Sequence, residues 1–228
     1  MKKILLFLIM AVSLGFFFSC SNEKKETKKR ECPKDLGGGI YLVNGHRFVD
    51  LGLPSGLLWA ETNIGAKTAA DDGYYFAWGE TATKEDYSIY SYKNAKYNST
   101  DEKDVLDKED DAAYVNWGSS CRMPTAEEVE ELDSCTWTWC SRVTSSGSSI
   151  DGFEISSNKN NNSIFLPASG YYYWDGLFGH GSECGYWSSS GYDAENEAYC
   201  YGLSYKFTFS AFRHERYIGY CIRPVAEP

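Results

Sequence analysis

Histidine is scarce in this sequence, and its cysteines lack the spacing that metal sites require. The three histidines, His46, His180 and His214, are too far apart for any two to share a helix face. Cys135 and Cys140 are separated by four residues, whereas structural zinc sites usually place two residues between paired cysteines. We therefore expect neither a metal centre nor another cofactor.

Positively charged residues are also fewer than negatively charged ones. Lys and Arg together number 22 against 32 Asp and Glu, which gives a formal net charge of −10. Phosphate groups repel so acidic a chain, so we expect no nucleic-acid partner. The serine run "YWSSS" (186–190) has the pattern of a strand and lacks the strand–turn–helix context of a nucleophile elbow. The sequence therefore predicts that the protein is not an enzyme.

The longest apolar stretch, "ILLFLIMAVSLGFFF", lies at the N-terminus between Lys3 and Ser19. It has about fifteen residues, fewer than the roughly 20 that a membrane-spanning helix needs, and its basic start is typical of a secretory signal. Because it ends on Cys20, it resembles a bacterial lipoprotein signal. We expect a signal peptide at 1–19, a lipidated Cys20 with a flexible polar tether at 20–37, and a folded domain at 38–228. The alternative is an ordinary cleaved signal beside a chance cysteine.

Glycine and tyrosine are abundant, with 21 and 18 residues, and they punctuate short apolar runs. Asn44-Gly45 between "IYLV" and "RFVDLG" predicts a hairpin. "LPSGLLWA" (53–60) is expected to form a turn followed by a buried run. "DDGYYFAWGE" (71–80), "NSIFLPASGYYYW" (162–174) and several other later segments are expected to form strands. Residues 82–110 are polar and are expected to form a long surface loop. Loops of this length are often functional. The sequence predicts an α+β fold of short, twisted antiparallel strands with one or two helices and long loops.

Two short helices are expected in the middle of the chain. One covers "DDAAYVNWG" (110–118), where Gly118 suits the C-terminal end. The other begins in "RMPTAEEVEELDS", where Thr125 as N-cap and Glu128 three residues later form a capping box. The four glutamates there suit the first turns of a helix. Paired carboxylates for acid–base catalysis are the alternative, which we consider weaker.

Seven segments in order resemble one known bacterial family. They are "FVDLGLPSGLLWAETNIGA" (48–66), "GYYFAWGET" (73–81), "DDAAYVNWGSSCRMPTAEEVEEL" (110–132), "CTWTW" (135–139), "SIFLPASGY" (163–171), "GYWSSS" (185–190) and "YIGYCIRPV" (217–225). The chain is identified as resembling the Fibrobacter succinogenes major paralogous domain, common in lipoproteins of gut Bacteroidetes. The resemblance implies a C-type-lectin-like fold, distantly similar to formylglycine-generating enzymes, in which the N- and C-terminal strands pair. It also implies that "CTWTW" belongs to the core.

Departures from the family pattern suggest how the cysteines pair. Cys121 stands where the family usually has Trp, and Cys221 where it usually has a small residue. The resemblance therefore implies a Cys121–Cys221 disulfide. Cys184 and Cys200 are expected to form a second disulfide, and Cys135 is expected to be a buried thiol. Cys32 and Cys140 remain unassigned.

The aromatic stretch "GYYYWDGLFGHG" (170–181) and the acidic loop "GYDAENEAY" (191–199) are the candidate ligand site. Alternation along a strand predicts that Tyr172 and Trp174 share one face. Exposed Tyr and Trp suit sugar rings or protein partners, although core packing is the alternative for each residue. The acidic loop has calcium-type oxygen ligands, but a solvated turn explains it better. The expected ligand contacts are Tyr172, Trp174, Asp175, Tyr192, Asp193 and Asn196.

The resemblance implies a lipid-anchored protein of the outer membrane that presents one binding domain to a glycan or protein at the cell surface. Its only expected membrane contact is the lipid on Cys20. Two alternatives stay open: a non-catalytic structural or assembly component of an envelope complex, and an enzyme related to formylglycine-generating oxidases. The sequence does not decide whether the domain faces the periplasm or the outside.

Overall fold

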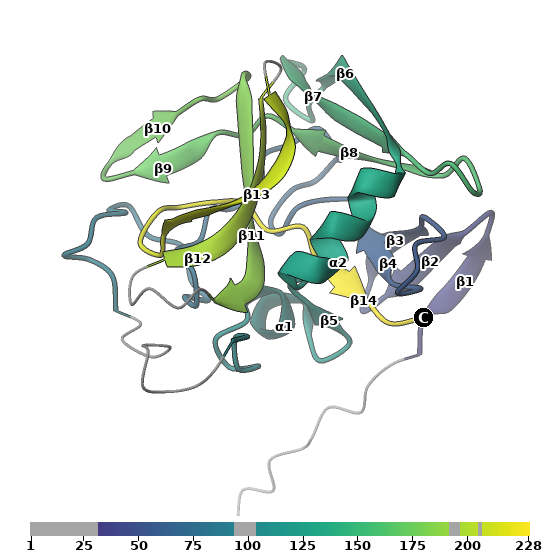
Figure 1. Cartoon of the computed structure of the whole chain (residues 1–228), viewed down its shortest axis with the longest axis horizontal. Coiled ribbons are helices and arrows are strands. Elements are labelled where there is room, and N and C mark those ends of the chain that lie inside the picture. The colour runs from purple at the N-terminus through teal and green to yellow at the C-terminus, as the bar shows by residue number, and fades with distance from the viewer. Residues whose placement is uncertain (1–31, 94–103, 192–196, 205–206) are drawn as a thin grey trace, which may run out of the picture.

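The computed structural model describes residues 32–93, 104–191, 197–204 and 207–228 (Figure 1). Within these residues the strands pair antiparallel in four sheets, and two short α-helices interrupt the series. The expected α+β class with antiparallel strands, few helices and long loops is therefore confirmed. The predicted signal peptide (1–19) and Cys20 lie outside the described residues.

The largest sheet joins the N-terminal strands to the C-terminal strand. Its order is β1-β2-β3-β4-β14-β5, so the C-terminal strand β14 lies between β4 and β5 and does not pair with β1. Because β1 begins at Lys34, the ordered fold starts inside the predicted tether (20–37). The strands are β1 (Lys34–Gly37), β2 (Ile40–Val43), β3 (His46–Asp50), β4 (Leu58–Ala60), β5 (Cys121–Arg122) and β14 (Val225–Ala226).

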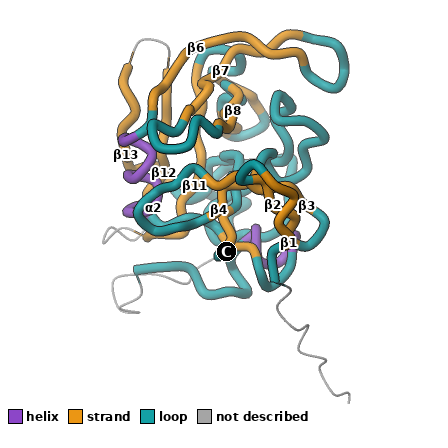
Figure 2. Tube along the Cα trace, turned by 90° about the vertical axis from the view of Figure 1, so that its right-hand side faces the viewer, coloured by secondary structure: helices purple, strands orange, loops and turns teal. Residues whose placement is uncertain are grey.

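The remaining sheets are smaller and form the upper half of the molecule in Figure 1. They comprise β6-β7-β8, the hairpin β9-β10, and β11-β12-β13, and Figure 2 shows the two three-stranded sheets from the side. Their bounds are β6 (Thr136–Val143), β7 (Ser149–Ser156), β8 (Ser163–Pro167), β9 (Tyr171–Tyr173), β10 (Gly176–Phe178), β11 (Glu183–Gly191), β12 (Glu197–Ser204) and β13 (Phe207–Glu215).

The hairpin predicted at Asn44-Gly45 is confirmed. Val43 pairs with His46, which leaves Asn44 and Gly45 as a two-residue turn. Both turn residues have positive φ, 49° and 84°, as a type I′ turn requires.

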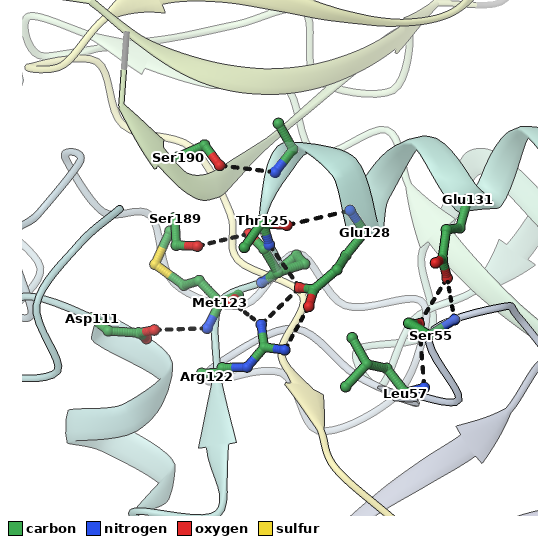
Figure 3. A network of polar contacts seen from close by, with 12 residues as sticks. Ser55, Leu57, Asp111, Arg122, Met123, Thr125, Glu128, Glu131, Ser189 and Ser190 are labelled. Atoms are coloured by element: carbon green, nitrogen blue, oxygen red, sulfur yellow. Dashed lines mark hydrogen bonds and ion pairs between the residues drawn. The ribbon is translucent and has the colours of Figure 1, made fainter. Parts of the chain in front are cut away.

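Both predicted helices are confirmed, together with the capping box. Helix α1 spans Ala112–Trp117 and α2 spans Ala126–Glu130, followed by the 3₁₀ turn η1 (Glu131–Ser134). Thr125 Oγ1 accepts from the backbone N–H of Glu128, and Glu128 Oε2 accepts from the N–H of Thr125 at 2.8 Å (Figure 3). The residues before α2 are therefore ordered by local hydrogen bonds.

The glutamates of α2 also hold neighbouring segments in place. The Arg122 guanidinium donates to both oxygens of Glu128, at 2.6 and 2.7 Å (Figure 3). Burial alone would raise the pKa of Glu128, but Arg122 and the N–H of Thr125 lower it below its ordinary value. Glu131 accepts from the backbone and hydroxyl of Ser55, on the loop before β4. These two carboxylates are structural anchors, a role that the sequence analysis did not predict for them.

Two expectations about strands were wrong. Residues 71–80 form a loop in which only Phe76 makes an isolated bridge, to Tyr220. The segment 162–174 divides into β8 and β9 in different sheets, because the chain turns at Gly170 with φ of 66°. "CTWTW" belongs to the core only in part: Cys135 is buried there and Trp137 packs against the same cluster, whereas Trp139 is half-buried on β6.

The core has two main clusters of buried side chains. Neighbouring residues of the same strand belong to different clusters. On β11, Trp187 enters one cluster and Tyr186 the other. On β4, Leu58 and Trp59 divide in the same way. Because successive side chains of a strand point to opposite faces, these strands are covered on both faces. This explains why the predicted buried run ending at Ala60 is continuously apolar.

This arrangement overturns both predicted disulfides. Cys121 lies in the first cluster and Cys221 in the second, and both are free thiols. The strand partner of Cys121 is Ala226, five positions beyond Cys221 in the chain, whereas disulfides need Cα atoms within roughly 7 Å. The partner of Cys200 on β11 is Trp187 and not Cys184, and Cys200 is also free. The expectation of a buried thiol at Cys135 is confirmed.

We predict that alkylation in denaturant without reductant will label Cys121, Cys200 and Cys221, as peptide mapping can show. Under native conditions these thiols should react slowly, because burial raises the pKa of Cys121 to about 12 and raises the pKa of the other two well above the ordinary thiol range. A peptide linked through any of the three would contradict the structure.

Candidate functional site

The hairpin β9-β10 ends in an unusual turn. Tyr173 pairs with Gly176, which leaves Trp174 and Asp175 as the two turn residues. Trp174 has φ of 57°, and Asp175 is not among the residues with positive φ. A positive φ at the first turn position is the pattern of a type II′ turn, which normally has glycine there. A large aromatic residue therefore occupies a glycine position.

Neighbouring backbone holds this strained residue. The left-handed conformation costs a side-chain-bearing residue roughly 1–2 kcal/mol. Trp174 N donates to Tyr87 O at 3.1 Å, and Tyr87 N donates to Trp174 O at 2.8 Å. Strain of this kind persists where the surroundings over-determine it, and it is concentrated at binding and active sites.

Exposed aromatic side chains surround the turn. Trp174 is 45% exposed, and its ring centroid lies 6.0 Å from that of Tyr90, which is 84% exposed. Tyr173 lies 6.5 Å from Trp174 and 6.4 Å from Phe178, and the half-buried Tyr217 lies 6.2 Å from Tyr173. We call these five residues the aromatic surface. Single exposed apolar residues are common, but a contiguous group indicates an interaction site.

The aromatic surface brings together distant segments of the chain. Tyr90 comes from the loop after Tyr87, while Tyr217 follows β13. The exposed side chains of Ile89 and Leu177 adjoin two of its members in the sequence and extend its apolar character. Such a surface offers flat rings for stacking, together with phenol hydroxyls for hydrogen bonding.

Two phenols near this surface, those of Tyr171 and Tyr217, have pKa values raised above the ordinary tyrosine value. Burial first, and then Glu215, raise the pKa of Tyr217, while burial and Glu183 raise that of Tyr171. His214, whose ring lies 6.1 Å from Tyr171, has its pKa lowered by burial. These groups therefore present hydroxyl and imidazole groups without charge, which suits recognition of a ligand more than charge-driven chemistry.

The predicted ligand residues do not all lie together in the structure. Trp174 and Asp175 are exposed in the turn, as expected. Tyr172 is half-buried against Tyr75 and Tyr87, at 4.8 and 5.5 Å, so it supports the hairpin from the other side. The prediction that Tyr172 and Trp174 share a face was wrong, because Trp174 belongs to the turn, where strand alternation ends. The predicted contacts Tyr192, Asp193 and Asn196 lie outside the described residues.

Sequence reasoning missed four members of the aromatic surface. Tyr90, Tyr173, Phe178 and Tyr217 were not among the expected contacts. A signal for Tyr90 was present, because it follows Ile89 within the polar surface loop expected at 82–110. Tyr217 had no local signal, since only the fold brings it beside Tyr173.

Within the described residues, no group of three or more His, Cys, Asp or Glu side chains is placed to hold a metal ion. Neither helix of that part has the length and apolar composition to cross a membrane. Comparison with models of protein families, with curated proteins and with solved structures found no match to the chain.

Proposed function

We propose that this protein is a lipid-anchored binding protein of the cell envelope whose aromatic surface holds a glycan or protein ligand. The observation that carries the proposal is Trp174, a strained and exposed tryptophan at the centre of the surface. A fold gains no stability from placing tryptophan in a glycine position, so selection for binding explains this residue better than selection for packing.

The family to which the chain belongs and its attachment to the membrane are part of the same proposal. The ordered motifs at 48–225 support membership of the Fibrobacter succinogenes major paralogous domain family, with a C-type-lectin-like arrangement of the antiparallel strands. The N-terminal pattern supports lipidation at Cys20 and attachment to the outer membrane through that lipid alone. The short segment between Cys20 and β1 then tethers the domain to the membrane.

The aromatic surface is tested with the full chain in detergent, applied to a glycan array and to separated envelope proteins. Tyr90→Ala should lower the affinity for the retained ligand at least tenfold, which corresponds to about 1.4 kcal/mol, because Tyr90 presents an open ring beside Trp174. Titration by calorimetry measures the change.

Val115→Ala is the matched control, since Val115 is also an exposed apolar residue but belongs to α1, away from the β9-β10 hairpin in Figure 1. It should leave the affinity unchanged. If the full chain binds neither a glycan nor an envelope protein, a purely structural role in the envelope would be favoured. Equal affinity in wild type and Tyr90→Ala would place the binding site elsewhere.

A further inference from the structure

A second concave site lies apart from the aromatic surface. It is a polar groove of about 430 Å³. Three segments form it: the loop 65–73, the turn 144–149 that links β6 to β7, and His180 after β10. No member of the aromatic surface lines this groove, so its ligand is a separate question. Its volume falls in the range of small-ligand sites.

Asp71 ties two walls of the groove together. Its Oδ1 accepts from the backbone N–H of Ser145 at 2.8 Å, and its Oδ2 accepts from the N–H of Thr68 at 2.8 Å. Burial would raise the pKa of Asp71, but these hydrogen bonds outweigh it and lower the pKa below its ordinary value. The carboxylate stays ionised and holds the turn against the loop, so the groove is pre-formed.

Asp72 fixes the third wall. Its Oδ2 lies 2.8 Å from Nε2 of His180. The backbone carbonyl of Asp72 accepts from Asn63 Nδ2 at 2.8 Å and from Cys221 Sγ at 3.2 Å, which anchors it to the core. The imidazole is therefore oriented by a carboxylate whose own position is set by buried groups. This leaves Nδ1 of His180 without a hydrogen bond among the described residues.

The groove offers both donors and acceptors. The hydroxyls of Thr144 and Ser146 lie 2.9 Å apart, and Ser146 donates to Ser148 at 3.3 Å. Each hydroxyl can donate and accept. Lys67 adds an exposed ammonium, with no ion-pair partner in the described part of the chain. An anion would meet Asp72 and a cation would meet Lys67, so this mixture favours a neutral ligand with many hydroxyl groups.

An aromatic ring stands at the rim. Tyr74 is 53% exposed, and its ring lies against Gly65, which lines the groove. A Cβ on Gly65 would lie 2.5 to 2.7 Å from three atoms of the ring, so the ring covers the bare backbone of this glycine. Gly65 has φ of 81° as well, which favours glycine independently. The exposed part of Tyr74 offers amphipathic aromatic surface beside the groove, and such surface suits the apolar face of a sugar.

We propose that this groove binds one neutral sugar residue, with the Tyr74 ring against its apolar face and the polar walls bonded to its hydroxyls. This groove is a second binding site, separate from the aromatic surface, and its proposed ligand belongs to a stated chemical class, the neutral sugars. It does not depend on which ligand the aromatic surface holds.

The experiment uses the full chain in detergent and four simple probes: the methyl glycosides of glucose, galactose, mannose and N-acetylglucosamine. Saturation-transfer NMR detects binding, and titration gives the dissociation constant. At least one glycoside should bind wild type. Tyr74→Ala should weaken it at least tenfold, and Ser146→Ala severalfold. Tyr90→Ala, which removes an exposed tyrosine of the aromatic surface, should leave it within twofold.

Several results would overturn the inference. Binding of no glycoside would do so, as would equal affinity in wild type and Tyr74→Ala. Loss of glycoside binding in Tyr90→Ala with retention in Tyr74→Ala would assign the sugar to the aromatic surface. Displacement of the glycosides by inorganic phosphate would indicate an anion site at Lys67 and His180. Failure of the aromatic-surface test, by contrast, leaves these outcomes unchanged.

Discussion

Replacing Arg223 with lysine is expected to lower the free energy of unfolding by about 3 kcal/mol. Arg223 is completely buried, and its guanidinium donates in three directions. Nε donates to Asn63 Oδ1 at 2.8 Å, and Nη2 donates to Phe165 O on β8 at 2.9 Å. Nη1 donates to the carbonyls of Ala60 and Glu61, at 3.1 and 2.9 Å.

The geometry of the guanidinium explains the size of this effect. Burial lowers the pKa of Arg223, but a guanidinium remains charged in proteins, and here carbonyl oxygens solvate it. A lysine ammonium is a single point that cannot reach acceptors on both the end of β4 and β8. Each buried carbonyl that loses its donor costs roughly 1–3 kcal/mol.

Urea unfolding followed by tryptophan fluorescence measures the loss. Arg47→Lys is the matched control, because Arg47 pairs with Glu61 at 2.6 Å while both side chains are well exposed. Exposed pairs contribute under about 1 kcal/mol, so this variant should unfold close to wild type. A loss for Arg223→Lys as small as that of Arg47→Lys would show that Arg223 does not join the sheets.

Replacing Trp174 is expected to remove ligand binding at the aromatic surface. Comparing two replacements also measures the backbone strain at this position, because both variants lose the same ring. Trp174→Ala and Trp174→Gly both delete the ring that lies between Tyr90 and Tyr173, so both should lose the ligand. Their stabilities should differ. Glycine adopts φ of 57° without strain, so Trp174→Gly should be more stable than Trp174→Ala by about 1 kcal/mol.

The neighbouring turn position provides the control. Asp175 is not among the residues with positive φ, so Asp175→Gly should be no more stable than Asp175→Ala. Thermal unfolding of the four variants, beside ligand titration, measures both quantities. If Trp174→Ala proves as stable as Trp174→Gly, the turn is not strained, and the main argument for function at Trp174 fails.

Local features of the fold could be predicted because their causes lie within a few residues. Asn44-Gly45 sets its own turn, and Thr125 and Glu128 form a capping box by contacts three residues apart. The short helix α1 was predicted in the same way, from Gly118 and the apolar residues before it. In each case the hydrogen bonds that stabilise the element close within the segment itself.

The disulfide prediction failed because pairing depends on which face of a strand each residue occupies. Cys121 lies on β5, at the edge of the largest sheet, Cys221 bridges to Tyr186 on β11, and the two cysteines enter different core clusters. Departure from a family pattern carried no information about this. Only the register of β14 against β5 decides it.

The sequence by itself determined the turns, the helix caps, the antiparallel class of the strands and the choice of the 170–181 stretch as a candidate site. The tertiary structure decided which residues complete each site. Tyr90 meets Trp174, and Asp72 meets His180, across 84 and 108 positions of the chain. Contacts between residues so distant form only when loops far apart in the chain are brought together by the complete fold, because no local hydrogen bond or periodicity specifies them.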